Sequence, residues 1–145
     1  MGEVVFSDSI KRKKLENILH PRISKKRACK IKKIGKIEPG AIVIIEFPLL
    51  IELQMHKDMD KVILVYIPPK TQINRLMRRE ALNFDQACKR LSSQIPIDSK
   101  IKYAHYVINN EDSLKKTAQA VKTVFKSLRK EEEKNRQASN TVKIR

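Results

Sequence analysis

The sequence predicts an α/β fold with a mainly parallel sheet, because apolar runs typical of strands alternate with segments of helical periodicity. Three runs rich in β-branched residues support this prediction: residues 41–45, 62–67 and 106–108. A continuous apolar run is typical of a strand that is buried on both faces of a parallel sheet. Three strands make a small sheet for a chain of 145 residues, so we expect the sheet to be incomplete.

Two helices are predicted before the first of these runs. Ser7 or Asp8 can cap a helix whose apolar residues recur at three- to five-residue steps. Pro21 interrupts the pattern, but a proline is well tolerated in the first turn of a new helix. We expect a second helix to follow and to end near Gly35, before a Glu-Pro-Gly turn at residues 38–40.

Three more helices are predicted later in the chain. One spans residues 71–80, and the next begins after the capping residue Asn83. Asp112 or Ser113 can cap the last helix, which has the clearest apolar stripe in the sequence. The residues of this stripe are Leu114, Ala118, Val121, Phe125 and Leu128. No apolar face continues beyond them, so we expect residues 131–145 to form a charged, disordered tail.

Positive charge is concentrated near the start of the chain. The net charge is +16, from 32 Lys+Arg and 16 Asp+Glu, and residues 11–37 hold twelve of the basic residues with a single acid. Such a surface attracts an anionic partner, either a nucleotide or a nucleic acid. Aromatic residues make up only 5% of the chain, which disfavours a stacking platform for single-stranded nucleic acid.

The composition also disfavours several other classes of protein. The longest apolar stretch, residues 41–45, is much shorter than the roughly 18 residues of a membrane span, and the first residues lack the pattern of a signal peptide. Cys29 and Cys88 are isolated and the histidines are scattered, so we expect no zinc site and a reduced, cytoplasmic protein.

Five segments resemble the dephospho-CoA kinase family, in the family's order and at similar spacing, over residues 2–128. Where the family commonly has Asp-x-Pro-Leu-Leu-aromatic-Glu, this chain has Glu-Phe-Pro-Leu-Leu-Ile-Glu. The five segments are residues 2–8 together with 15–23, residues 46–52, residues 66–72 together with 75–82, residues 93–96 (Ser-Gln-Ile-Pro) and residues 106–110 (Tyr-Val-Ile-Asn-Asn).

This resemblance implies a three-layer, P-loop kinase-like fold, with a parallel sheet and helices on both faces. It implies a helical acceptor segment on the CoA side over residues 1–37 and the C-terminal part of the kinase core over residues 38–130. A lid lies at about residues 75–96 within that core, and the tail at 131–145 follows.

The glycine-rich P-loop of the family has no counterpart in this sequence. The three glycines are Gly2, Gly35 and Gly40, and consecutive backbone N–H groups of a glycine-rich loop are what cradle nucleotide phosphates. We therefore expect an N-terminally truncated kinase whose first strands are absent and whose N-terminal half is encoded upstream or supplied by another chain. The isolated chain is expected to be inactive.

The function implied by the resemblance is transfer of the ATP γ-phosphoryl group to the ribose 3′-hydroxyl of dephospho-CoA, the last step of coenzyme A biosynthesis. The implied partners are ATP, with Mg²⁺, and dephospho-CoA. Phosphoryl transfer depends on neutralising negative charge, so arginines are the first candidates for catalysis.

The resemblance also assigns candidate site residues. The catalytic arginines are Arg79, Arg75 and Arg90, and the residues beside ATP are Asn109 and Asn110. The acceptor-binding residues are His20, Pro21, Arg22, Leu49 and Leu50, and Glu46 holds Mg²⁺ indirectly, through water. Each has an ordinary structural alternative: a solvated charge for the arginines, a turn or helix cap for the asparagines, a strand-end ion pair for Glu46 and a helix junction for His20.

Two other functions remain open on the sequence alone. One is a different P-loop nucleotide kinase, against which the Glu-Phe-Pro-Leu-Leu and Gln-Ile-Pro segments argue. The other is a basic nucleic-acid-binding module that uses residues 11–37. No RNA- or DNA-reading motif is present, so nucleotides rather than nucleic acids are the expected partners.

Overall fold

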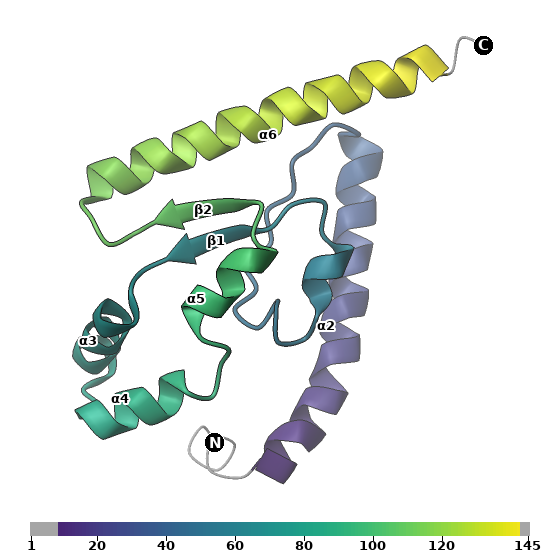
Figure 1. Ribbon diagram of the computed structural model, residues 1–145. Helices are drawn as coiled ribbons and strands as arrows, with labels where there is room; N and C mark the ends of the chain where they lie inside the picture. Colours follow the sequence, from purple (N-terminus) through teal and green to yellow (C-terminus); the bar gives the residue numbers. More distant parts are fainter. Residues whose placement is uncertain (1–8, 143–145) are drawn as a thin grey trace. The chain divides into compact units, whose positions relative to one another are not determined.

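The computed structural model describes residues 9–142, which divide into two compact units with a boundary between Ile44 and Ile45 (Figure 1). This boundary lies seven residues beyond the one expected at residue 37. The first unit consists of a long helix and a short extended segment. The second unit contains a two-stranded parallel sheet with helices on both of its faces.

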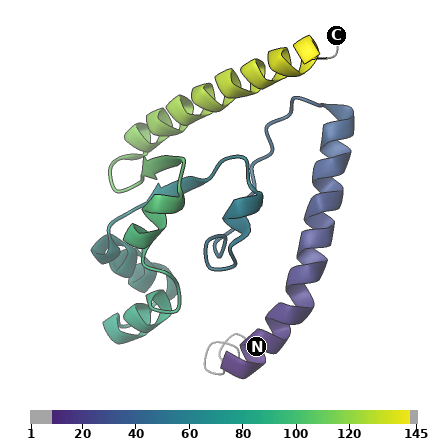
Figure 2. The same cartoon turned by 45° about the vertical axis from the view of Figure 1, so that its right-hand side comes forward.

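The first unit is built on helix α2 (Ser9–Ile37), which is one continuous helix with Pro21 inside it (Figure 2). Two helices were predicted here, and that prediction was wrong. A proline inside a helix costs about 3 kcal/mol, but it removes only one backbone N–H donor. The lysines and arginines on both sides, and the leucines before Pro21, are good helix formers, so the helix continues through it. The predicted caps Ser7 and Asp8 lie outside the described residues.

The first apolar run, residues 41–45, forms no strand in the described part of the chain. It follows a turn in which the Ala41 N–H donates to the Glu38 carbonyl over 3.0 Å. A β-branched run becomes a strand only where a neighbouring strand pairs with its backbone, and none of the described residues does so here. The expected strand is therefore corrected to an extended segment.

The second unit is organised by the parallel pair β1 (Ile63–Tyr66) and β2 (Tyr106–Asn109). Their register places Ile63 beside Tyr106 and Tyr66 beside Asn109. The pair is anchored just before β1, where the Val62 carbonyl accepts from the Tyr106 N–H and the Val62 N–H donates to the His105 ring. Both strands were predicted, and so was the parallel α/β arrangement.

Between the strands the chain forms a helical excursion and returns. Helix α3 (Pro69–Glu80) and helix α4 (Phe84–Leu91) come first, followed by the short α5 (Ile97–Lys100) and the 3-10 turn η2 (Ile101–Tyr103). Another 3-10 turn, η1 (Met55–Asp58), precedes β1. The predicted cap is confirmed: the Asn83 side chain accepts from the Gln86 N–H over 2.9 Å, and the Gln86 side chain accepts from the Asn83 N–H over 3.0 Å.

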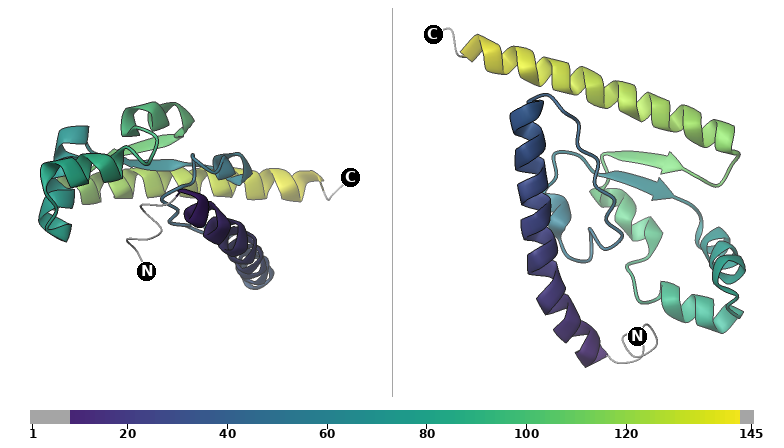
Figure 3. Two further views of the ribbon diagram at one scale, coloured as in Figure 1. Left: turned by 90° about the horizontal axis from the view of Figure 1, so that it is seen from below. Right: turned by 180° about the vertical axis from the view of Figure 1, so that it is seen from behind.

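Helix α6 (Leu114–Val142) runs alongside β2 as one unbroken helix (Figures 1 and 3). The Glu131 carboxylate joins it to the strands, because it accepts from the Tyr106 hydroxyl over 2.7 Å and pairs with Lys61 over 2.8 Å. On the opposite face of the sheet the Tyr66 hydroxyl donates to Asp98 of α5 over 2.8 Å. Tyr106 pairs with Ile63, so these two side chains share a face of the sheet. Tyr66 lies three positions after Ile63 and therefore points to the other face, because successive side chains of a strand alternate. Helices α5 and α6 thus cover different faces of the pair.

The disordered tail predicted from residue 131 is helical as far as Val142. Glu131 contributes the contacts to the strands just described, and Glu132 pairs with Arg136 one turn later over 3.0 Å. Lysine, glutamate and glutamine have high helix propensity, so this charged segment needs no apolar face to extend a helix that packing has already started.

The face of α6 that packs on the sheet differs from the predicted stripe. The least exposed positions of its first five turns share one side of the helix: Thr117, Ala120, Val124, Ser127, Leu128 and Glu131. The predicted residues Val121 and Phe125 are about half exposed, and Leu114 is 87% exposed. The apolar stripe of the sequence therefore lies mostly beside the contact rather than in it.

We expect Val124→Ala to lower the free energy of unfolding by about 1.5 kcal/mol, because it removes two buried carbon atoms at about 0.8 kcal/mol each. The matched control is Val121→Ala, the same change three residues earlier. It should cost less, since Val121 is 47% exposed and alanine has the better helix propensity. Urea unfolding monitored by circular dichroism measures both, and an equal or larger loss for Val121→Ala would contradict this packing.

Candidate functional site

The candidate site lies where β1 and β2 end, because ligands of open parallel sheets bind beyond the carboxyl ends of the strands. After β1 the chain enters α3, which carries Arg75 and Arg79. After β2 it enters the loop of Asn109 and Asn110, before α6. The tertiary structure thus brings the predicted catalytic helix and the predicted ATP-side loop to one edge of the sheet.

Arg75 connects these two segments directly. Its Nη2 donates to the Asn110 carbonyl over 2.8 Å, and the Asn110 N–H donates to the Tyr66 carbonyl at the end of β1 over 2.8 Å. One turn earlier on α3, the Thr71 hydroxyl donates to the Glu111 carboxylate over 3.2 Å. Two bonds from α3 and one from the end of β1 therefore hold the loop that follows β2.

The two asparagine side chains shape this loop. The Asn109 Oδ1 accepts from the Glu111 N–H over 2.8 Å, and the Asn110 Oδ1 accepts from the Thr117 hydroxyl of α6 over 3.1 Å. The Ser113 hydroxyl accepts from the Lys116 N–H at the first turn of α6, so Ser113 is the cap of the two residues predicted. These contacts are the turn-forming role considered for the asparagines, and they leave the Asn110 amide nitrogen available to a ligand.

Arg79 and Arg90 meet at a single carboxylate. The Glu80 Oε1 accepts from the Arg79 Nη2 over 2.9 Å, and the Glu80 Oε2 pairs with the Arg90 Nη1. Ala81 adopts the left-handed conformation, with φ 52°, which ends α3 and turns the chain into α4. The turn between the helices thus brings together two predicted arginines, while Arg75 lies apart at the loop.

The predicted acceptor residues Leu49 and Leu50 lie in a tight turn that precedes η1. Leu49 and Leu50 are half-buried, and their carbonyls accept from the Leu53 and Met55 N–H groups over 3.1 and 3.0 Å. Glu46 is exposed just before this turn, so its carboxylate is open to solvent. His20, Pro21 and Arg22 all lie on α2 of the first unit, and their acceptor role stays a prediction.

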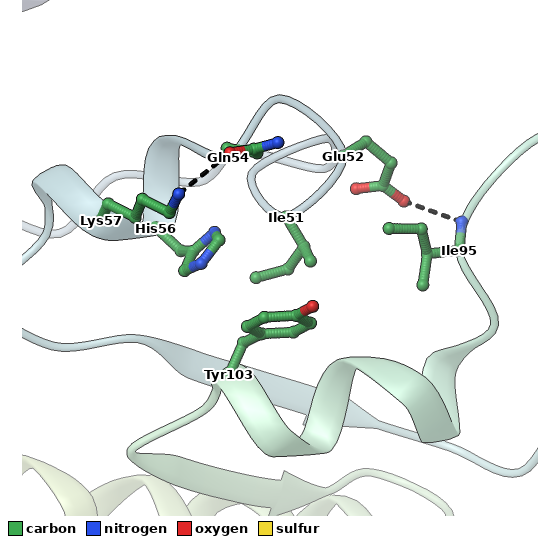
Figure 4. A pocket seen from close by; sticks show the side chains of 7 residues that line it. All are labelled: Ile51, Glu52, Gln54, His56, Lys57, Ile95 and Tyr103. Carbon is green, nitrogen blue, oxygen red and sulfur yellow. Dashed lines mark hydrogen bonds between the residues drawn. The ribbon is translucent and has the colours of Figure 1, made fainter.

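A pocket of about 370 Å³ lies between the segment that ends the Leu49 turn and the α5–η2 segment (Figure 4). Its lining residues are Ile51, Glu52, Gln54, His56, Lys57, Ile95 and Tyr103. The centroids of the His56 and Tyr103 rings lie 4.8 Å apart, and the Ile51 side chain points toward the Tyr103 ring. The His56 Nδ1 and the Glu52 Oε2 are buried without a hydrogen-bond partner.

Glu52 is the anionic group of this pocket. Its Oε1 accepts from the Ile95 N–H over 3.1 Å and pairs with Lys100 over 2.7 Å. Burial by itself would raise the pKa of Glu52, but the Lys100 ammonium and the backbone N–H groups of Glu52 and Ile95 outweigh burial and lower the pKa. The carboxylate is therefore ionised at neutral pH.

Sequence reasoning missed the pairing of Glu52 with Lys100. Glu52 did have a signal, because it closes the Glu-Phe-Pro-Leu-Leu-Ile-Glu segment. Lys100 had none, since it is one of 32 basic residues and nothing in its local sequence marks it as buried.

The described chain contains neither a cluster of metal ligands nor a membrane-spanning helix. Among residues 9–142, no three His, Cys, Asp or Glu side chains gather closely enough to hold a metal ion. No helix of the described chain is both long enough and apolar enough to cross a membrane.

Comparisons with known proteins point to one family. A family model described as dephospho-CoA kinase matches residues 1–116. The dephospho-CoA kinase of Syntrophus aciditrophicus is 36% identical over 139 residues, which cover 96% of this chain and 59% of that protein. The Listeria monocytogenes enzyme is 38% identical over 123 residues, covering 85% and 61%. This chain thus spans about three-fifths of the length of the curated relatives that it matches.

Solved structures agree with these matches. A dephospho-CoA kinase from Campylobacter jejuni has a TM-score of 0.63 and 32% identity, covering 89% of this chain and 63% of that one. A crystal structure from Thermus thermophilus has a TM-score of 0.68 and 31% identity, covering 87% and 64%.

The site edge offers a pH-dependent test. The bond from the Tyr66 hydroxyl to Asp98 raises the pKa of Tyr66 above 10.0, with burial as a lesser cause. Asp98→Asn should lower the pKa toward 10.0, because a neutral amide stabilises the protonated hydroxyl less than a carboxylate does. Tyrosinate absorbance measures it in a Tyr103→Phe/Tyr106→Phe background, which leaves Tyr66 as the remaining tyrosine. The same midpoint in both proteins would contradict the bond.

Proposed function

This chain belongs to the dephospho-CoA kinase family, and we propose that it takes part in transfer of the ATP γ-phosphoryl group to the ribose 3′-hydroxyl of dephospho-CoA, the last step of coenzyme A biosynthesis. The observation that supports this most directly is the pairing of Arg79 and Arg90 around Glu80 at the carboxyl edge of the sheet. The family match also disfavours the alternative of a different nucleotide kinase.

The arginine pair suits the chemistry of phosphoryl transfer. Negative charge is spread over the oxygens of the transferred group, so catalysis relies on positioned cations more than on covalent chemistry. The Arg79 side chain is 74% exposed and uses one of its donors on Glu80, so the rest of its planar fork can reach phosphate oxygens. Glu80 holds both guanidinium groups near each other before a nucleotide arrives.

The loop of Asn109 and Asn110 is proposed to lie beside the adenine of ATP. Its backbone is held by Arg75 and by the end of β1, which gives a nucleotide a rigid edge rather than a mobile loop. In this proposal Arg75 acts on ATP through the loop, whereas Arg79 and Arg90 act on the phosphates.

The acceptor, dephospho-CoA, is proposed to bind at Leu49 and Leu50 of the second unit. A role in acceptor binding is also proposed, separately and from the family resemblance, for His20, Pro21 and Arg22 of α2 in the first unit. The two leucines are half-buried in a hydrogen-bonded turn, so part of their apolar surface stays open to a ligand. Arg22 is exposed on a strongly basic helix, which suits an anionic acceptor.

Mg²⁺ is proposed to enter with ATP rather than as a resident ion. Mg²⁺ usually keeps several waters and is held by nucleotide phosphates and one or two carboxylates. The single exposed carboxylate of Glu46 fits such a role through a water molecule.

The two cysteines, Cys29 and Cys88, are free thiols, and this agrees with a proposed location in the reducing cytoplasm.

A chimera tests the proposed function. Residues 1–145 replace the matching segment of the Listeria monocytogenes enzyme, and formation of coenzyme A from ATP and dephospho-CoA is measured. We expect turnover, and we expect Arg79→Ala to lower kcat by about 100-fold, the scale for losing one donor to a transition-state oxygen. The matched control, Arg78→Ala, removes the neighbouring exposed arginine of α3 and should leave kcat nearly unchanged.

Two results would overturn the proposal. One is a folded chimera that forms no coenzyme A. The other is an equal loss of kcat in Arg79→Ala and Arg78→Ala, because a general loss of positive charge would then explain the effect.

A further inference from the structure

The Glu52 carboxylate joins two segments that lie 43 residues apart in the sequence. Glu52 belongs to the turn segment that contains Leu49 and Leu50, and its Oε1 accepts from the Ile95 N–H over 3.1 Å. Ile95 lies in the connection that leaves α4 and leads into α5 (Figure 4). The bond therefore ties the turn of the proposed acceptor site to the chain that returns from the α3–α4 pair.

The surroundings make this tie strong. The side chains of Glu52 and Lys100 are only 17% and 8% exposed, and charge-assisted hydrogen bonds are stronger where water is excluded. The charged and titratable groups around the carboxylate come from three elements: Lys100 of α5, His56 and Lys57 of η1, and Tyr103 of η2. Glu52 is the one carboxylate among the residues that line the pocket.

The α3–α4 pair is thereby held at both of its ends. At its start, the Gln72 side chain donates to the Ile67 carbonyl over 2.9 Å and Arg75 bonds to the loop after β2. At its far end, the chain is held through Ile95. Between these attachments the pair carries Arg79 and Arg90, so a shift of the far attachment moves these arginines relative to Leu49 and Leu50.

We propose that Glu52 is a positioning residue, which sets where the Arg79–Arg90 pair lies relative to the Leu49–Leu50 turn by holding the chain at Ile95. This inference rests on the proposed function, in which the pair contacts phosphate and the turn contacts the acceptor. Glu52 touches neither substrate; it acts through the backbone of Ile95.

Amide hydrogen exchange on the 145-residue chain tests the tie without any substrate. In Glu52→Ala the protection of the Ile95 N–H should fall by about tenfold or more, the scale for one hydrogen bond to a charged group, while the N–H groups of β1 and β2 keep theirs. Asp98→Asn is the matched control, because it removes the exposed carboxylate of α5 and should leave Ile95 unchanged. Unchanged protection in Glu52→Ala, or equal loss at Ile95 and in both strands, would overturn the proposal.

The pH dependence of amide exchange at Ile95 in the unsubstituted chain provides a second measurement. The pKa of Glu52 is below its ordinary value of 4.5, because the folded state favours the ionised carboxylate. The hydrogen bond from the Ile95 N–H to Glu52 is therefore fully formed above pH 4.5, and it weakens as the pH falls through the lowered pKa. After correction for intrinsic exchange rates, Ile95 should lose protection over that range. In Glu52→Gln/Lys100→Met, which keeps a carbonyl acceptor but no charge, it should not. Identical profiles in the two proteins would contradict the role of the charge.

Kinetics of the chimera then test the consequence for the arginines. Glu52→Ala should lower kcat by about tenfold and change the KM for ATP less. Misplaced arginines reduce the stabilisation of the transition state more than they reduce the binding of ATP. An unchanged kcat would overturn the positioning role. A chimera that still contains Glu52 but is inactive would instead reject the proposed function. The exchange experiment needs no activity, so it tests the contact between Glu52 and Ile95 even if the proposed function fails.

Discussion

The parallel pairing of β1 with β2 is the constraint on which the second unit depends. Parallel strands cannot be joined by a tight turn, so the chain between Tyr66 and Tyr106 must leave one end of the sheet and return to the other. It does so through α3, α4 and α5, and this excursion places the arginines beyond the carboxyl ends of the strands. The same pairing aligns Tyr66 with Asn109, so the chain segments after both strands start side by side and can bond through Arg75.

Two carboxylates organise the basic surroundings of this excursion. Glu80 gathers Arg79 and Arg90 between the two helices, and Glu52 pairs with the buried Lys100 and holds the backbone of Ile95. In a chain with twice as many basic as acidic residues, the positions of the acids decide where the positive charge can gather. Glu80 has two cationic partners, and it lets their guanidinium groups lie closer together than mutual repulsion would otherwise allow.

The fold was predictable where neighbouring residues in the sequence determine the structure. The helix cap at Asn83 was predicted correctly, and so were the strands at residues 62–67 and 106–108, because caps and β-branched runs act within a few residues. The prediction of two helices around Pro21 was wrong, because one lost hydrogen bond did not outweigh the helix formers on both sides. The prediction of a strand at residues 41–45 was wrong for a different reason, because a strand needs a neighbouring strand to pair with, and no local sequence pattern reveals whether one is there.

The sequence by itself determined the order and type of most elements, the basic character of the chain and the family that it resembles, because these depend on local pattern and on ordered segments. Only the tertiary structure decided which side of α6 is buried, with Val124 rather than Val121 against the strands. It also decided that Lys100 is the lysine buried against Glu52, among the lysines whose burial the structure describes. Such choices depend on contacts between residues far apart in the sequence, where the shape of the neighbouring element determines which side chain loses its water.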